Sequence, residues 1–256
     1  MERIGVIGGT GLYEGEDVEV RRISTPYGDA SPVAIAEIHR RGVVFMPRHG
    51  TRHELPPHRV NYRANIYALK ELGVTRIIAT NSVGGISPEL SPGDVVVPHD
   101  IIDFTAGRAN TFYDTRAVHI DMSEPYCPEL RKALIDAGRE VLGRVVESGV
   151  YAVTQGPRFE TPAEIRMLSK LGADVVGMTA MPEAALAREM ELCYASICTV
   201  TNYAAGLKQN RLTAREVVEV VRENEDKLRR LIVRVIHLIP EERKCSCSHA
   251  LVDAML

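Results

Sequence analysis

The sequence predicts a single α/β domain in which a central mixed β-sheet is flanked by helices. Short apolar segments alternate with amphipathic helical segments along most of the chain, which is the pattern of this fold class. Glycine and proline mark the points where the strands end. The chain has 256 residues, of which 45% are hydrophobic and 25% are charged, so one sizeable core is possible. We place this domain at residues 1–240 and assign residues 241–256 to a polar C-terminal tail.

The charge and the hydropathy of the chain exclude several kinds of partner. The net charge is −3 and the signs are mixed, so no basic surface for nucleic acid is predicted. No apolar run is long enough to cross a bilayer. The first residues lead directly into a strand rather than into a secretory signal. We therefore expect a cytoplasmic protein that binds neither nucleic acid nor membrane.

The first predicted strand, residues 3–7, runs into a glycine turn at Gly8-Gly9-Thr10-Gly11. A dinucleotide site would need the pattern G-x-G-x-x-G at the start of a helix. Here Glu14 occupies the position of the last glycine, and no helical pattern follows. The N–H groups of such a turn and the Thr10 hydroxyl suit a bare phosphate instead. Further short strands are predicted at residues 18–24, 33–38 and 42–46.

A polar loop follows at residues 47–58. His49 and His53 have the spacing of two metal ligands on a helix, but the glycine and the paired prolines of this loop argue against a helix. We therefore predict no metal here. The fork of N–H donors on Arg48 matches the oxygens of a phosphate.

The next segments predict a second place where an anion could bind. Residues 60–72 have the apolar face of a helix, and residues 76–83 read as a buried strand. This strand ends in Asn81-Ser82-Val83-Gly84-Gly85, and glycines at a strand end let backbone N–H groups approach an anion. The segment from Ala106 to Tyr126 is long, polar and irregular, which is typical of functional loops and of interfaces.

The stretch from Thr154 to Met181 carries the clearest functional pattern. It follows strands predicted at 94–98, 100–104 and 145–153 and a helix predicted at 128–142. Gly156-Pro157 predicts a turn, and Thr161 with Glu164 predicts the capping box of a helix that ends near Gly172, before a strand at 173–176. Open α/β sheets bind ligands at the carboxyl edge. The two strand ends and the helix start are expected to gather four side chains there, which suit a flat heterocycle beside an anion: Phe159, Glu160, Met178 and Thr179.

The last part of the chain is predicted to form a helix at 182–190, a strand at 194–200 and a long amphipathic helix at 213–239. Thr213 and Glu216 have the spacing of a capping box at the start of this last helix. Its charged face is expected to be a solvated surface.

The cysteines fall into two groups. Three stand in apolar or mixed stretches and are predicted to be buried thiols, namely Cys127, Cys193 and Cys198. Cys245 and Cys247 form a C-x-C pattern in the polar tail and are treated separately. A zinc fragment, a redox-active pair and a disulfide are all open for this pair, and we favour a disulfide or redox chemistry.

Two stretches carry a family resemblance, GPRFET from Gly156 and LGADVVGMTAMPEAALARE from Leu171. Both resemble the trimer-forming branch of the purine nucleoside phosphorylase and methylthioadenosine phosphorylase family. Other motifs fall in the same order between Ile4 and about Glu225: GGTGLY, PRHG, ATNSVGGI, SPGDVVVP, HIDMSEPYCPELR and TNY. The resemblance implies a nucleoside phosphorylase-like fold, a pentosyltransferase activity in purine salvage, and a homotrimer or a hexamer made of two trimers. It also implies inorganic phosphate as co-substrate, with no cofactor and no metal.

The resemblance assigns residues to each part of the site. The phosphate-binding residues that it implies are Thr10, Arg48, His49, Asn81, Ser82 and Thr179. The nucleoside-binding residues that it implies are Phe159, Glu160, Met178, Asn202, Tyr203, Ala204, Ala214 and Val218, with Glu160 and Asn202 as the catalytic pair. His119 either faces the ribose 5′ end in a neighbouring subunit or is a surface histidine.

The residues at the base position predict a 6-oxopurine. The Glu160 carboxylate accepts from the N–H at purine position one, which only 6-oxopurines carry, and the Asn202 amide donates to the ring nitrogen at position seven. In the 6-aminopurine branch of the family, aspartates stand at the positions of Asn202 and Ala204 and a serine at that of Glu160. We therefore expect phosphate-dependent cleavage of inosine and guanosine to the free base and ribose 1-phosphate.

The ribose 5′ end leaves an alternative open. Ordinary 6-oxopurine enzymes of this family place a histidine where this chain has Ala214, and Val218 lies one turn further along the predicted helix. The wall would then be small and apolar, with room for a methylthio group. The alternative is therefore an S-methyl-5′-thioinosine or S-methyl-5′-thioadenosine phosphorylase. A binding module without chemistry and a hydrolase are the alternatives from other classes, although Thr10, Arg48 and Thr179 have no purpose in a hydrolase.

Overall fold

The computed structural model describes residues 2–9, 19–208 and 213–255 of the chain. These residues form an α/β fold around one mixed sheet in the order β2-β5-β6-β1-β7-β11-β10-β9, with β12 paired to β7 and β8 paired to β12. The fold class predicted from the sequence is confirmed. The strands of the sheet are β1 (Arg3–Gly8), β2 (Glu19–Arg21), β5 (Val33–Ile38), β6 (Arg41–Pro47), β7 (Val74–Gly85), β8 (Val95–Val96), β9 (Asp100–Phe104), β10 (Val150–Thr154), β11 (Val175–Gly177) and β12 (Cys193–Tyr203), while β3 (Ser24–Thr25) and β4 (Gly28–Asp29) pair separately.

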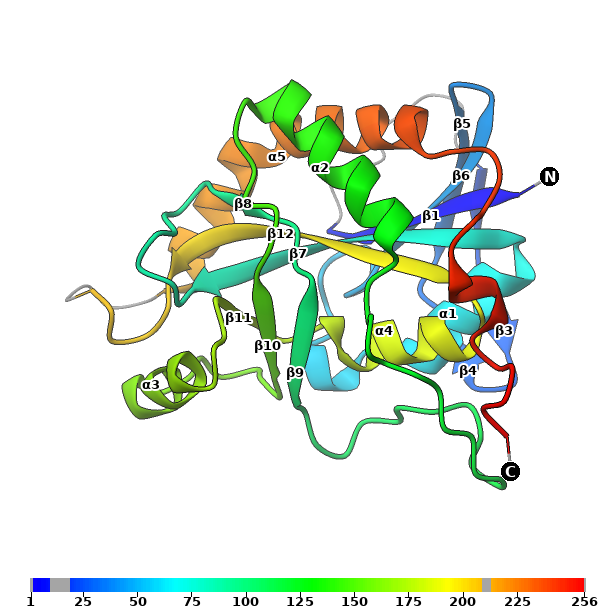
Figure 1. Ribbon diagram of the computed structural model, residues 1–256, viewed down its shortest axis with the longest axis horizontal. Helices are drawn as coiled ribbons and strands as arrows, with labels where there is room; N and C mark the ends of the chain where they lie inside the picture. The colour runs from blue at the N-terminus through cyan, green and yellow to red at the C-terminus, as the bar shows by residue number, and fades with distance from the viewer. Residues whose placement is uncertain (1, 10–18, 209–212, 256) are drawn as a thin grey trace.

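Helices cover both faces of the sheet (Figure 1). One face carries α2 and α5, the other carries α1 and α4, and α3 lies near the ends of β10 and β11. Each face has its own buried cluster, with Ile78, Leu134 and Val235 on the side of α2 and α5, and Ile77 and Ile66 on the side of α1. The bounds of the helices are α1 (Tyr62–Glu71), α2 (Pro128–Leu142), α3 (Pro162–Lys170), α4 (Ala180–Glu189) and α5 (Ala214–Leu238), with short 3₁₀ turns η1 (Pro57–Arg59) and η2 (Ser246–His249).

The position of β7 decides where the functional segments meet. β1 and β12 both pair with β7 in the parallel direction, so the carboxyl ends of these strands open on the same edge of the sheet. β11 pairs with the end of β7 in the antiparallel direction, with Val176 opposite Gly84. The chain after β11 therefore runs back along β7 and brings Thr179 beside Asn81.

The helix starts follow from local hydrogen bonds that the sequence predicts. Thr161 and Glu164 form the capping box of α3, and Thr213 and Glu216 form that of α5, as expected. Such boxes satisfy N–H groups that a helix start leaves without an intrahelical partner. The strand predicted at 145–153 is shorter than expected, because β10 begins at Val150 and residue 146 makes only an isolated bridge.

The tail packs against the domain, which corrects the separate treatment of its cysteines. All five cysteines are free thiols, so a disulfide, one of the two possibilities that we favoured for Cys245 and Cys247, is not formed. Both instead lie beside Cys127 and Cys193, which are buried as predicted. Proximity in space decides this grouping, because the C-terminal tail returns to the amino-terminal ends of α2 and β12.

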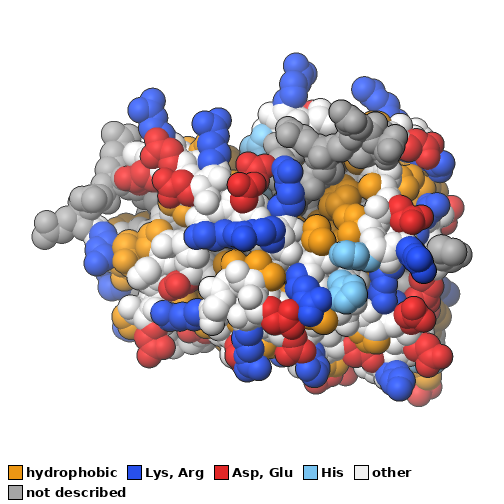
Figure 2. All heavy atoms as spheres, turned by 90° about the horizontal axis from the view of Figure 1, so that it is seen from above, with side chains coloured by type: hydrophobic (Ala, Val, Ile, Leu, Met, Phe, Trp, Pro, Cys, Tyr) orange, Lys and Arg blue, Asp and Glu red, His pale blue; other side chains and the backbone are white. Residues whose placement is uncertain are grey.

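The distribution of charge on the surface and the polarity of the helices agree with the mixed charge and the moderate hydrophobic content of the sequence. Figure 2 shows basic and acidic side chains interspersed on the face that α2 and α5 cover, with no field of a single sign. Among the described helices, none is long and apolar enough to span a membrane.

Candidate active site

Arg48 follows β6 and forms a buried ion pair. The guanidinium is 3% exposed and binds Glu183 of α4 in a bidentate manner, with Nε 2.8 Å from Oε2 and Nη2 2.7 Å from Oε1. Nη1 donates to the Thr80 carbonyl oxygen at 2.9 Å, and the Tyr194 hydroxyl donates to Glu183 at 2.9 Å. Burial alone would lower the pKa of Arg48, but the charge and the hydrogen bonds of Glu183 outweigh it and raise the pKa, so the guanidinium stays charged.

This geometry corrects the expectation that the fork of Arg48 is directed at phosphate. A guanidinium has five N–H donors. Glu183 takes two of those on Arg48 and Thr80 takes a third. The remaining donors, one on Nη1 and one on Nη2, are available to an anion at the end of the side chain. Arg48 can thus supply charge and two hydrogen bonds while Glu183 holds it in place.

Asn81 of β7 joins two hydroxyl groups in the interior. Its Nδ2 donates to Thr179 Oγ1 at 2.8 Å, and its Oδ1 accepts from Ser196 Oγ. All three side chains are buried. Thr179 Oγ1 accepts the bond from Asn81 through a lone pair, and its hydroxyl keeps a proton of its own that it can donate. The sequence analysis missed Ser196, which no local pattern distinguishes from the other residues of β12.

Ser82 and Thr10 are the two other residues predicted to contact phosphate through their side chains or backbone. Ser82 is exposed, and successive residues of a strand point to opposite faces, so its side chain lies on the other side of β7 from that of Asn81. Any contact from Ser82 to the anion would therefore come from its backbone. Thr10 lies outside the described residues.

His49 is neutral at pH 7 because burial lowers its pKa to about 4, an effect to which the charge of Arg48 adds. Its Nδ1 lies 2.8 Å from the Leu55 carbonyl oxygen. A carbonyl only accepts, so Nδ1 carries the proton and Nε2 carries the lone pair. The ring stacks on His53, with 4.4 Å between the centroids. A neutral His49 can therefore accept a hydrogen bond at Nε2 but cannot donate one there.

The lowered pKa of His49 predicts a loss of stability in acid. The pKa is about 4 in the folded chain and about 6.5 in an unfolded chain. The unfolded state therefore binds more protons between these values, and the free energy of unfolding falls as the pH falls through this window. We expect the free energy of unfolding of His49→Gln to fall by roughly 1–3 kcal/mol less than that of the wild type when the pH is lowered from 7 to 4.5. Urea unfolding at pH 7 and at pH 4.5 would measure it.

The matched control for this experiment is His58→Gln in η1, where the side chain is exposed. This variant should lose as much stability between the two pH values as the wild type. An equally large loss in His49→Gln would show that His49 is not the group responsible.

Glu160 lies in the loop between β10 and α3. Thr154 Oγ1 donates to Glu160 Oε1 at 2.5 Å and lies 3.3 Å from the Gly177 carbonyl oxygen. The carboxylate is thus held at the point where β10 and β11 end, as the sequence predicted. Its neighbour Phe159 is 38% exposed. Met178 meets the same loop at Gly156, where φ is +61° and a Cβ would lie 2.5 Å from the Met178 sulfur, so a side chain is excluded there.

Arg108 holds these strand ends together and was missed by the sequence analysis. Its Nη2 donates to the Gln155 carbonyl oxygen at 2.7 Å, and its Nη1 donates to the carbonyl oxygens of Met178 and Met181 at 2.8 Å. Its Nε also donates to the Gln155 side chain at 3.2 Å. The partners are backbone carbonyls 47 to 73 positions away, so no local pattern could have identified them.

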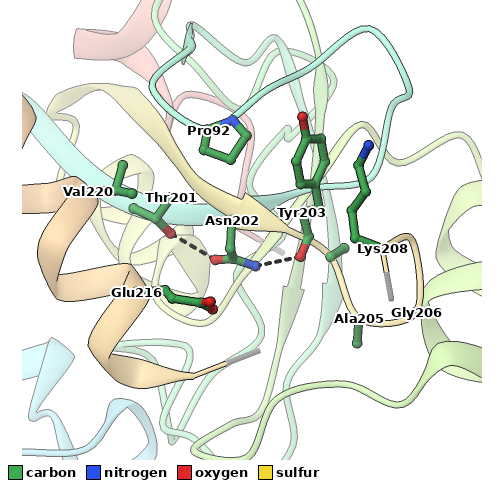
Figure 3. A pocket seen from close by; sticks show the side chains of 10 residues that line it. Pro92, Thr201, Asn202, Tyr203, Ala205, Gly206, Lys208, Glu216 and Val220 are labelled. Atoms are coloured by element: carbon green, nitrogen blue, oxygen red, sulfur yellow. Dashed lines mark hydrogen bonds between the residues drawn. The ribbon is translucent and has the colours of Figure 1, made fainter. Parts of the chain in front are cut away.

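A cavity of about 620 Å³ opens where β12 ends (Figure 3). Asn202, Tyr203 and Ala204 line it, three of the residues predicted to bind the nucleoside. The Asn202 Oδ1 accepts from the Thr201 hydroxyl at 2.9 Å, and Nδ2 donates to the Tyr203 carbonyl oxygen at 2.9 Å. An amide nitrogen has two N–H groups, so one donor on Asn202 remains for a ligand.

The residues of α5 that line this cavity are not the ones that we predicted. Glu216 and Val220 line it, and in Figure 3 the Glu216 side chain extends from α5 toward Asn202. Val218, which we expected in the wall with Ala214, is 48% exposed, and neither is part of the lining. The buried residues of the second half of α5 set the rotation of this helix. Val220 lies about three whole turns before buried Leu231, whereas Val218 points to the opposite side.

The described site therefore has two parts. The first part holds four residues that the sequence predicts to bind phosphate, namely Arg48, His49, Asn81 and Thr179. The second part is the cavity at Asn202. Phe159, Glu160 and Met178 lie by the ends of β10 and β11 and are not among the residues that line the cavity. The arrangement offers a cation and the Thr179 hydroxyl to an anion, and a carboxylate and an amide to a heterocycle.

Comparison with known proteins gives consistent results along the whole chain. The model of the phosphorylase superfamily matches residues 3–237. A protein of Methanopyrus kandleri named probable S-methyl-5′-thioinosine phosphorylase is 54% identical over 255 residues, which cover 99% of each chain. The 6-oxopurine nucleoside phosphorylase of Pyrococcus furiosus is 49% identical, again over 99% of each chain. Among solved structures, the methylthioadenosine phosphorylase of Schistosoma mansoni in complex with adenine is 32% identical with a TM-score of 0.93, covering 100% of this chain and 99% of that one.

Proposed function

The chain belongs to the phosphorylase superfamily, and from this membership we propose that it is a purine nucleoside phosphorylase that acts on 6-oxopurine nucleosides. Inosine or guanosine and inorganic phosphate would give the free base and ribose 1-phosphate. The observation that carries this proposal is the presence of Glu160, fixed by Thr154, and of Asn202 with one free N–H. A carboxylate and an amide are complementary to the N–H at position one and the ring nitrogen at position seven of a 6-oxopurine.

The chemistry requires no nucleophile from the protein. Phosphate binds on the sugar face opposite the base, the bond between the ribose carbon and the purine nitrogen breaks, and a phosphate oxygen forms the new bond to that carbon. Arg48 and Thr179 position the phosphate and complement its charge, and Asn202 stabilises the negative charge that develops on the departing base. The co-substrate is phosphate, and we propose that no cofactor takes part.

A second candidate is cleavage of S-methyl-5′-thioinosine. Two observations favour it: Val220 gives the cavity wall an apolar side chain, and the Methanopyrus kandleri relative carries that name. Glu216 lines the same wall, and its carboxylate would accept a hydrogen bond from the 5′-hydroxyl of a ribose bound there. We therefore propose that both inosine and its methylthio analogue are substrates.

A substrate panel tests the proposed function. We expect phosphate-dependent cleavage of inosine, guanosine and 5′-methylthioinosine, and a kcat/KM for adenosine and methylthioadenosine about 10-fold to 100-fold lower. The reason is that one unmatched buried hydrogen bond costs about 1–3 kcal/mol. Release of the base is measured with and without phosphate.

Each outcome of the panel has a definite meaning. Cleavage of inosine without phosphate would identify a hydrolase, and binding without cleavage would identify a module that lacks chemistry. If adenosine is cleaved as well as inosine, the roles of Glu160 and Asn202 are wrong. Complete rejection of 5′-methylthioinosine would exclude the second candidate alone.

We also propose a homotrimer, or a hexamer made of two trimers. Phe104 at the end of the edge strand β9 is 41% exposed, and Phe159 beside the site is 38% exposed. We propose that a partner subunit covers these two aromatic side chains, because aromatic residues are enriched at subunit interfaces. Light scattering at micromolar concentration should give a mass about three or six times the 28.2 kDa of one chain. A monomer would contradict the proposal.

The proposed role in the cell follows from the reaction. Release of a free purine and a sugar phosphate suits purine salvage, and we propose a cytoplasmic location. In a trimer, His119 could reach a neighbouring site, although in the single chain it is exposed and its backbone N–H donates to the Ala254 carbonyl oxygen at 2.8 Å.

A further inference from the structure

Four cysteines from three distant parts of the chain meet in one place. They are Cys127 at the start of α2, Cys193 at the start of β12, and Cys245 and Cys247 around η2 in the tail. Their four sulfur atoms all lie within 4.8 Å of one another. Within the described part of the chain, no other group of three or more His, Cys, Asp or Glu side chains is arranged in a way that could hold a metal ion.

The mutual distances favour a metal site over a pair of disulfides. In a tetrahedral zinc site with Zn–S bonds of about 2.3 Å, each sulfur lies about 3.8 Å from the other three. The sulfur atoms of Cys193 and Cys245 are 3.4 Å apart, well beyond the length of about 2.05 Å of an S–S bond. Two disulfides need proximity only within each pair. Proximity among all four sulfurs is the geometry that a single central ion requires.

We propose that Cys127, Cys193, Cys245 and Cys247 together bind one structural Zn²⁺ ion. Binding releases the four thiol protons, because thiolates are the ligands, and the dication with four thiolates keeps a net negative charge. The Arg188 guanidinium lies 3.7 Å from the Cys247 sulfur and supplies a nearby positive charge. Soft thiolate ligands in a tetrahedral set select zinc over magnesium or calcium.

The surroundings indicate a structural rather than a catalytic ion. Cys127, Cys193 and Cys247 are at most 2% exposed and belong to the core cluster between the sheet and the helices α2 and α5. Four protein ligands leave no open position for a substrate or a water molecule. Cys193 also lies at the opposite end of β12 from Asn202, so the ion is remote from the proposed chemistry.

The ion would fasten the tail to the rest of the domain. Beyond the cysteines, the Lys244 N–H donates to Glu129 of α2 at 2.8 Å, and the tail forms a bridge between Met255 and Val118. Val118 belongs to the same irregular segment as Arg108, which holds the strand ends of the site. Zinc would thus stabilise the tail and, through it, the segment that carries Arg108.

Metal analysis of the full-length protein tests the proposal directly. The protein is purified with reductant and without chelator, supplied with Zn²⁺ and desalted. We expect about one zinc per chain, and a cobalt-substituted sample with the intense visible bands of tetrahedral cobalt thiolate. A chelator should lower the Tm by roughly 5 °C or more.

Two variants locate the site. Cys245→Ser changes the most accessible of the four ligands, and we expect it to lose at least about 90% of the bound zinc and the cobalt thiolate bands. Cys198→Ala is the matched control, because Cys198 is buried outside the cluster, and it should bind metal as the wild type does. Circular dichroism of both variants confirms that they are folded.

Three results would overturn the proposal. The first is wild-type protein that takes up neither zinc nor cobalt. The second is Cys245→Ser that binds as much metal as Cys198→Ala. The third comes from titrating thiols in denaturant with chelator, where a zinc site leaves all five cysteines reactive without reductant. If four of them react only after reduction, the cluster holds disulfides instead.

Discussion

Arg48→Ala is expected to weaken phosphate use and to destabilise the fold at the same time. The guanidinium is one of the groups that we propose to bind phosphate, and loss of a charged hydrogen-bonding partner costs about 1.5–3 kcal/mol, or a 10-fold to 100-fold rise in KM for phosphate. The same change leaves Glu183 with a buried charge and no cation, since Glu183 is only 1% exposed. Removing one member of a buried ion pair costs about 3–5 kcal/mol of folding stability.

A second variant separates the two effects. In Arg48→Met with Glu183→Gln, no charge remains buried, and the Gln side chain still accepts from the Tyr194 hydroxyl, which donates to Glu183 in the wild type. We expect this double variant to recover most of the lost free energy of unfolding while its KM for phosphate stays high. Phosphate kinetics and urea unfolding of the wild type, Arg48→Met, Glu183→Gln and the double variant measure the cycle. An unchanged KM for phosphate in the folded double variant would remove Arg48 from the phosphate site.

Asn202→Asp is expected to reduce cleavage of inosine by about 100-fold to 1,000-fold in kcat/KM, which is the effect of losing one well-placed donor to a developing negative charge. The aspartate replaces the free N–H of Asn202 with a carboxylate oxygen facing the purine. This carboxylate repels the 6-oxygen of inosine. It should repel adenosine less, because the 6-amino group can donate to a carboxylate. The ratio of kcat/KM for inosine to that for adenosine should therefore fall.

The burial of Ala204 is the reason for changing Asn202 alone. Changing Ala204 to Asp as well, as the resemblance to the 6-aminopurine branch suggests, would bury a second carboxylate, since Ala204 is buried against Val176 and Ile165. The single change avoids this. Thr201→Val is the matched control, because it removes only the hydroxyl that donates to the Asn202 Oδ1. It should reduce activity less than Asn202→Asp and leave the preference between bases unchanged, and an equal shift of preference in both variants would count against the proposed role of Asn202.

Much of the fold could be predicted because its signals are local. The capping boxes at Thr161 and Thr213 join residues three positions apart, and the glycine turns end strands within a few residues. The same holds for Glu160, which is held by Thr154 only six positions away. Patterns of this range are set by backbone geometry and hydrogen bonding within one or two turns of the chain, so they can be identified in the sequence alone.

What only the tertiary structure decided involves residues far apart in the chain. Arg48 pairs with Glu183 across 135 positions, and Arg108 binds carbonyl groups on two other segments. The rotation of α5, which brings Glu216 rather than Ala214 to the cavity, depends on the core against which its second half packs. The cysteine cluster likewise forms only once the tail returns to α2 and β12. The order of the strands and the packing of the helices determine such contacts, and these depend on the whole sequence at once rather than on any segment of it.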